Sequence, residues 1–520
     1  MFKKIKEKII EYKFLILFGI VISIIAHGMI LNNFLINEDS LDRLSNGSTF
    51  RMIRSGRWAS FIITDYILRG NYIPFFNNSF SIAFLVASGV IITDVFELKH
   101  KMARIFTVSA YSLLPLISIM FGYAYDILNY SFALLLIVVG VTIIIKFKKV
   151  VSKLFACVLI AFSIGIYQSF ISIASAFLLS YYLLQIIKGK KINAKEVIIN
   201  IIYLILSLVL YYIILKVLLT ITGLSLTGYK NANNFNIKDV ILNLPQNVLN
   251  TIKYYRDYLF GRTTVLKTHY STHLIILLFF MIFIIYFIKN ILNKKINIKE
   301  NIIIILLVIL YIPALYSITL ITQTYDYSSE YGITFFTILI ISCCFEMVAN
   351  KYIKTFLSIL TTALIVLGLL STNYIHTQQK LLSKMTYNYY LLIYNDVLKN
   401  EDYDKDTKVF FYGKVTKNNN YLKSKAKIYK YMKEGYKNGP AGLGNMTSKK
   451  YMFYRDRKAH YLLDYYYFSL NGYDEIEVKG NKKLKERLFN CGNSMPNYPK
   501  EGSIKKCPIE DVIIVKLGDY

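Results

Sequence analysis

The sequence predicts a polytopic membrane protein: an all-α bundle of about 11 transmembrane helices with outer amphipathic helices and a small C-terminal α/β domain. Of the 520 residues, 55% are hydrophobic and only 18% are charged, whereas about a quarter of a soluble domain is charged. Apolar runs close to the roughly 20 residues that a helix needs to cross a bilayer recur along the N-terminal 374 residues. Lysine and arginine gather in alternate connections between these runs. The composition therefore excludes a soluble enzyme, a disordered chain and a disulfide scaffold.

Eleven apolar segments are predicted to span the membrane, each bounded by lysines or by loop residues. They are Phe14–Ile36, Phe80–Phe96, Ile105–Phe121, Ile127–Ile145, Leu154–Tyr167, Phe170–Ile187, Val197–Leu219, His273–Leu292, Ile302–Ile321, Ile333–Val348 and Phe356–Tyr374. The 34 residues from Leu154 to Ile187 form either two short spans joined at Tyr167–Ser169 or one long kinked span. Two short spans fit the distribution of charge better.

The charges in the short connections predict the orientation. Lysine and arginine next to a span are retained in the cytoplasm, and the N-terminus with the connections on its side carries 22 of them. The short connections Gly122–Asp126, Tyr167–Ser169 and Gln323–Glu330 carry none. We therefore expect a cytoplasmic N-terminus and, after eleven spans, an outer C-terminal domain. The predicted domains are residues 1–374, with long outer loops at 37–79 and 220–272, and residues 375–520.

Both long outer loops contain a segment with the pattern of an amphipathic helix. These segments are Phe50–Leu68 and Lys238–Phe260, and each alternates apolar residues with charged ones. Trp58 is the only tryptophan of the chain, and anchoring at the membrane interface is the simplest explanation for it. A helix lying at the interface, with no further role, remains an alternative for both segments.

The first outer loop also carries the candidate chemical groups. Its five basic residues (Arg43, Arg51, Arg54, Arg57 and Arg69) are all arginine, whose planar fork of donors suits phosphate oxygens. A lipid phosphate at the outer surface would account for these cations, although head groups in general would also do so. Glu38 and Asp39 follow the first span directly, and a partly buried carboxylate there could act as a general base. Solvated carboxylates at the end of a span are the alternative.

The C-terminal segment is predicted to form a small α/β domain. Thr377–Leu398 reads as an amphipathic helix, Lys408–Gly413 as a strand and Asp511–Leu517 as a second strand. Residues 375–520 hold 27 of the lysines and arginines and 16 of the aspartates and glutamates, a net charge of +11. Cys491 and Cys507 both lie in this domain, so an oxidising exterior could join them in a disulfide.

Several short motifs, taken in order, resemble those of the O-antigen glucosyl transferase II family of polytopic membrane glycosyltransferases, which belongs to the C-type superfamily. The motifs are His27-Gly28, Asn37-Glu38-Asp39, Ser55-Gly56-Arg57-Trp58, Tyr167-Gln168-Ser169, Met495–Ser503 and Val512–Gly518. The resemblance implies transfer of a hexose, typically glucose, from a polyprenyl-phosphate carrier to a cell-surface polysaccharide on the outer face. It also implies that the acidic pair is the catalytic site, here Glu38 and Asp39.

The chemistry of such a transfer agrees with the residues. A phosphodiester donor leaves as a stable anion, so the reaction needs a base for the acceptor hydroxyl and cations for the departing phosphate. The candidate phosphate contacts are Arg51, Arg54, Arg57, Arg256 and Arg262, and the candidate sugar or acceptor contacts are Trp58, Tyr167 and Gln168. The cofactor is unknown: a divalent cation held by Glu38 and Asp39 is compatible with the sequence, but two carboxylates alone do not establish one.

Two other classes of protein are alternatives to the glycosyltransferase. A flippase or transporter of lipid-linked glycans is expected to carry charged groups in mid-membrane, and the spans carry almost none. A scaffold displaying the outer domain would not need eleven spans. The net charge of +29 would suggest nucleic acid in a soluble chain, but here it is sorted by the membrane, so we expect no nucleic-acid partner. The family resemblance implies that the location is the inner membrane of a bacterial cell.

Overall fold

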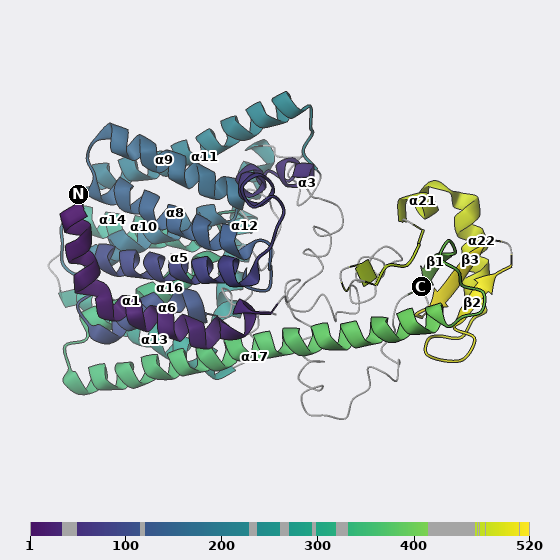
Figure 1. Ribbon diagram of the computed structural model, residues 1–520. Helices are drawn as coiled ribbons and strands as arrows, with labels where there is room; N and C mark the ends of the chain where they lie inside the picture. The colour runs from purple at the N-terminus through teal and green to yellow at the C-terminus, as the bar shows by residue number, and fades with distance from the viewer. Residues whose placement is uncertain are drawn as a thin grey trace. The chain divides into compact units, whose positions relative to one another are not determined.

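The computed structural model describes residues 2–33, 49–114, 120–227, 237–260, 270–293, 298–318, 331–413, 463–464, 466, 468–473, 475–508 and 510–518. The chain divides into two compact units (Figure 1). The first consists of residues 1–33, 48–121 and 125–374, and the second of residues 34–47, 122–124 and 375–520. The Glu38 and Asp39 pair and Arg262 lie outside the described residues.

The first unit is a bundle of helices. Its long members are α1 (Phe2–Leu31), α5 (Pro74–Val95), α6 (Lys101–Leu113), α8 (Ile127–Lys146), α9 (Val150–Ile166), α10 (Phe170–Ile187), α11 (Ala194–Thr222), α12 (Ile237–Leu259), α13 (Tyr270–Asn293), α14 (Ile298–Ala314), α16 (Ile333–Met347) and the first part of α17 (Lys351–Leu398). The membrane-crossing window of α10 is 83% buried and that of α11 is 22% buried. Thus α10 lies at the centre of the bundle, and α11 exposes most of its apolar surface at an edge.

Seven of the described helices are long and apolar enough to cross a membrane: Glu7–Leu31, Pro74–Val95, Ile127–Lys146, Phe170–Ile187, Ala194–Thr222, Ser271–Lys289 and Lys351–Thr377. They coincide with seven of the eleven predicted spans. The other four predicted spans hold shorter helices among the described residues, namely α6, α9, α14 and α16. The end of α6 has a local cause, because Leu114 precedes a proline, which disfavours helical backbone, and Leu114 is extended. A total of eleven spans stays a prediction.

The stretch from Leu154 to Ile187 forms two helices, α9 and α10, separated at Tyr167–Ser169, as the charge pattern favours. At the opposite end of the bundle, Asp94 accepts hydrogen bonds from the ammonium groups of Lys8 and Lys146, each at 2.6 Å. This pair of contacts ties the start of α1 to the ends of α5 and α8. A lysine of the N-terminal segment and one of a connection, both predicted to be cytoplasmic, therefore meet at one end of the bundle.

The second unit is a three-stranded sheet between two helical layers. Its strand order is β1 (Lys408–Tyr412), β3 (Val512–Lys516), β2 (Ile504–Cys507), with β1 parallel and β2 antiparallel to the central β3. The end of α17 packs on one face through Tyr389, Tyr390 and Ile393, and α22 (Lys482–Asn493) packs on the other through Leu484 and Leu488. Because both faces are covered, β1 and β3 are almost continuously apolar.

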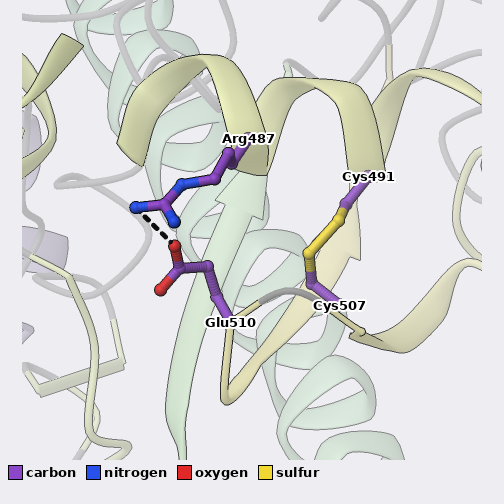
Figure 2. The surroundings of a disulfide bond; sticks show 4 residues. All are labelled: Arg487, Cys491, Cys507 and Glu510. Carbon is purple, nitrogen blue, oxygen red and sulfur yellow. Dashed lines mark ion pairs between the residues drawn. A yellow bond between two sulfur atoms is a disulfide. The ribbon is translucent and has the colours of Figure 1, made fainter. Parts of the chain in front are cut away.

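A disulfide joins Cys491 of α22 to Cys507 of β2, beside an ion pair of 2.9 Å between Arg487 and Glu510 (Figure 2). The bond fastens one helical layer to the edge of the sheet. Cys507 itself is buried in the cluster between them.

Two predicted helices differ from the structure. The segment Phe50–Leu68 is not one helix but α3 (Thr49–Arg54), α4 (Trp58–Phe61) and a π-helix, η1 (Ile62–Ile67). The span Phe356–Tyr374 and the helix Thr377–Leu398 are a single helix, α17, because no proline or glycine lies between them. The predicted helix Lys238–Phe260 agrees with α12 within one residue at each end.

Candidate functional site

The corner between α3 and α4 is the centre of the candidate site. Gly56 has a φ of +77° and follows the last turn of α3. Its N–H donates to the carbonyl of Ile53 at 2.9 Å, and the N–H of Arg57 donates to that of Met52 at 2.8 Å. This pair of bonds is the Schellman motif, which ends a helix on a residue with left-handed backbone. The motif breaks the predicted helix between Arg54 and Trp58.

Three successive carbonyl groups at this corner accept hydrogen bonds from distant segments. The carbonyl of Arg54 accepts from the N–H of Thr227 at 2.9 Å, beyond the end of α11. The carbonyl of Ser55 accepts from the Gln168 amide nitrogen at 2.7 Å, and that of Gly56 accepts from the Tyr211 hydroxyl at 3.0 Å. Carbonyls at the end of a helix have no partner within it, so these contacts both satisfy them and fix the corner against α11, beside which α3 lies (Figure 1).

Arg57 lies over the ring of Tyr167, with 4.5 Å between the guanidinium carbon and the ring centroid. Stacking of this kind stabilises a cation beside an aromatic face. Tyr167 is itself buried, and its ring contacts those of Tyr130 at 5.3 Å and Tyr331 at 6.3 Å between centroids. A rigid aromatic platform from α8, the α9–α10 turn and the start of α16 therefore supports one half-buried arginine.

Trp58 is packed inside the bundle and is not an interfacial anchor, since only 4% of its surface is exposed. Its ring meets Phe162 edge to face, with 5.5 Å between centroids. Gly165 makes this position possible, because a Cβ on that residue would lie 2.5 Å from Cε2 of the indole. Trp58 thus locks α4 onto α9 directly beside Arg57.

The remaining predicted arginines occupy different surroundings. Arg51 and Arg54 are exposed on α3, three residues apart, and so on neighbouring positions of one helix face. Arg54 also donates to the carbonyl of Ser225 at 3.3 Å. Arg256 on α12 donates to the carboxylate of Asp257 through Nε at 3.0 Å and through a terminal nitrogen at 2.8 Å. The structure therefore brings Arg51, Arg54 and Arg57 to one short segment, and it pairs Arg256 with an acid.

A second polar contact supports the segment that follows the corner. The amide nitrogen of Asn129 on α8 donates to the hydroxyls of Ser60 at 3.0 Å and Thr64 at 2.7 Å, all three being buried. In the loop after η1, the Tyr72 hydroxyl accepts from Asn78 at 3.1 Å, and burial raises the pKa of Tyr72 to about 12. Tyr72 is therefore neutral near pH 7.

The sequence predicts Trp58, Tyr167 and Gln168 as sugar or acceptor contacts, which stays a prediction, and Tyr211 and Asn129 were missed. Both are polar residues in otherwise apolar spans, which was an available signal. Neither side chain is charged near neutral pH, so the distribution of charged residues in the spans does not indicate them. The role of Gly56 was also missed, because one glycine within an apolar-periodic segment does not by itself end a helix.

Together, the apolar bundle and the cationic corner define a multi-pass membrane protein with an anion-binding candidate site at one end of its helices. A scan against protein families matches the family described as Glucosyl transferase GtrII over residues 28–340. The chain belongs to this family, and the resemblance drawn from its motifs is confirmed. The protein is therefore a membrane glycosyltransferase. Searches of curated proteins and of solved structures returned no match.

The matched region contains the whole candidate site, from α3 through the α9–α10 turn to α12. It ends within α16 and leaves out the second unit's sheet.

Proposed function

We propose that the protein transfers a hexose, namely glucose, from a polyprenyl-phosphate carrier to a cell-surface polysaccharide on the outer face of a bacterial inner membrane. The observation that carries the proposal is the half-buried Arg57, held over Tyr167 within the region matched by the Glucosyl transferase GtrII family. An arginine in a fixed orientation suits a phosphate group, because its planar fork contacts two oxygens at once.

In the proposed reaction the acceptor hydroxyl attacks the anomeric carbon of the sugar. Its proton passes to the carboxylate of Glu38 or Asp39, and the bond between the anomeric carbon and the phosphate oxygen breaks. Polyprenyl phosphate leaves with the bonding electrons, and Arg57, with Arg51 and Arg54 nearby on the chain, stabilises the added negative charge. A single displacement of this kind inverts the anomeric configuration. Trp58 supports the site by packing against α9 inside the bundle, and the ring of Tyr167 lies beneath the Arg57 guanidinium.

The proposed orientation places the N-terminus in the cytoplasm and residues 375–520 outside. The disulfide between Cys491 and Cys507 supports this side for the second unit, because such bonds persist in oxidising compartments. Lys8 and Lys146 both contact Asp94, and positive charge at this end of the bundle supports placing that end in the cytoplasm.

The test is a transfer assay in membranes with labelled polyprenyl-phosphate glucose and the surface polysaccharide. Asp39→Asn and Glu38→Gln are compared with Asp239→Asn, an exposed carboxylate on α12 in the other long loop. We expect wild-type transfer in the control and loss of transfer in at least one of the first two variants, with normal membrane insertion in all three. Full transfer in both Glu38→Gln and Asp39→Asn would remove the catalytic assignment.

The polysaccharide itself gives a second readout. Cells lacking the protein should lose one side-branch sugar from their surface glycan, as composition analysis measures. An intact glycan structure whose export alone is reduced would instead favour the lipid-linked glycan flippase.

A further inference from the structure

We propose that Gln168 and Tyr211 form a latch that positions Arg57 for the donor phosphate, with Tyr211 a positioning residue of the transfer reaction. The proposal rests on the proposed function in one respect, since it takes a polyprenyl phosphate as the ligand of Arg57. It assigns Gln168 to positioning and not to contact with the sugar or the acceptor.

The two side chains and the corner form a closed set of hydrogen bonds. The Gln168 amide nitrogen donates to the carbonyl of Ser55 at 2.7 Å and to the Tyr211 hydroxyl at 3.3 Å. The Tyr211 hydroxyl in turn donates to the carbonyl of Gly56 at 3.0 Å. An amide nitrogen has two hydrogens and a hydroxyl has one, so these three bonds use every donor that the two groups possess. The amide nitrogen of Gln168 is thereby committed to the corner.

The space around Gly56 is shaped for this latch. A Cβ at Gly56 would lie 2.5 Å from the Gln168 amide nitrogen and 2.8 Å from the Tyr211 hydroxyl. The left-handed backbone at Gly56 independently favours glycine. Two independent features therefore require glycine at position 56: the close approach of the Gln168 and Tyr211 side chains, and the left-handed backbone of the turn.

The latch acts on Arg57 through the backbone on one side and through Tyr167 on the other. Arg57 follows Gly56 directly, and its own N–H is held by the carbonyl of Met52 at 2.8 Å. The ring beneath its guanidinium belongs to Tyr167, the residue before Gln168. The arginine and its platform are therefore fixed to each other by neighbouring residues. Trp58 and Thr227 would still hold the corner without the latch, but the direct hydrogen bond from Gln168, the neighbour of the Tyr167 ring, would be lost.

The experiment measures binding of polyprenyl phosphate to the full-length protein in detergent micelles, which add no tryptophan. Trp58 is the only tryptophan and adjoins Arg57, so its fluorescence reports on this site alone. Tyr211→Phe removes only the hydroxyl of the latch, and Gln168→Met removes the amide at similar length. Tyr212→Phe is the matched control, because Tyr212 is the next residue of α11 and is 49% exposed.

Tyr211→Phe removes both the donor to the Gly56 carbonyl and the acceptor of the Gln168 amide. We expect it to raise the dissociation constant about fivefold, because hydrogen bonds of this kind contribute modestly in net, and Tyr212→Phe to leave it within about twofold. In an Arg57→Lys background, Tyr211→Phe should have no further effect, because the latch acts through the arginine. Thermal denaturation of each variant accompanies the binding curves to verify folding.

Equal binding by Tyr211→Phe and Tyr212→Phe would overturn the proposal. So would an undiminished effect of Tyr211→Phe in the Arg57→Lys background, which would indicate a general structural role, and so would failure of the wild type to bind polyprenyl phosphate. A wild type that binds the lipid with the expected coupling, yet transfers no sugar, would sustain the latch and refute the proposed function.

Discussion

Replacing Gly165 by alanine should destabilise the protein by displacing Trp58. The new Cβ would lie 2.5 Å from Cε2, 2.7 Å from Cζ2 and 2.9 Å from Nε1 of the indole, whereas ordinary contacts are 3.4–4 Å. The ring must therefore retreat by about 1 Å, which would disturb its edge-to-face contact with Phe162. Overpacking of this kind costs about 1–3 kcal/mol, and alanine returns up to about 1 kcal/mol of helix propensity. We expect a net loss of roughly 1–2 kcal/mol.

The assay is equilibrium unfolding in detergent, followed by the emission of Trp58, whose spectrum also reports the local displacement. Gly28→Ala is the matched control, since Gly28 lies in α1 and, among the described residues outside its own helical backbone, no heavy atom would lie within 4 Å of a Cβ there. The control should be neutral or slightly stabilising. In a Trp58→Phe background the cost of Gly165→Ala should shrink, because a smaller ring leaves room. An increase in stability like that of the control, with an unchanged emission spectrum, would refute the reasoning.

Replacing Cys491 by serine should lower the free energy of unfolding of the second unit by about 3 kcal/mol, as for a closed loop of roughly 15 residues. A denaturation midpoint that changes neither with the substitution nor with added reductant would contradict this. Arg57→Lys keeps the charge but loses the planar fork, so it should weaken polyprenyl phosphate binding about tenfold, whereas Arg54→Lys on the exposed face should change it about twofold; equal losses in a binding titration would contradict the ranking. The N–H of Asp406 donates to the Asp404 carboxylate at 2.8 Å and lowers the pKa of Asp404. The ionised Asp404 carboxylate therefore stabilises the turn fully above the pKa of an unfolded aspartate, and this stabilisation is lost as the pH falls through the lower pKa of Asp404 in the folded protein. A carboxyl titration by NMR that gave Asp404 an ordinary or raised pKa would be inconsistent with this hydrogen bond.

The sequence was sufficient for elements whose pattern is local. The separation of α9 from α10 at Tyr167–Ser169 follows from a polar interruption between two apolar runs. Strands β1 and β3 are short apolar runs bounded by turn residues, and both were predicted. The edge strand β2 was not, because Cys507 is the only fully buried residue of Ile504–Cys507 and two of the four are lysines.

The break at Gly56 could not be predicted from the local pattern. The apolar spacing of residues 50–68 suits one helix, and a glycine is tolerated within it at a cost of about 1 kcal/mol. The Schellman motif at Gly56 ends the helix. The carbonyls of Ser55 and Gly56 then accept from Gln168 and Tyr211, more than a hundred residues along the chain, and these contacts stabilise the break. Tertiary contacts of this kind leave no periodic signal in the sequence around the break.

The surroundings of the arginines decide which of them best suits a phosphate. Arg256 shares its guanidinium with the carboxylate of Asp257, so an incoming phosphate would have to compete with a charge already in contact. Arg51 and Arg54 are exposed, and water screens their attraction for an anion. Arg57 is half-buried over Tyr167, where a charge–charge interaction is weakened less by solvent and the side chain has less freedom to lose on binding. Under the proposed function, the arginines of this segment therefore act mainly through Arg57, the residue that the proposed latch would position.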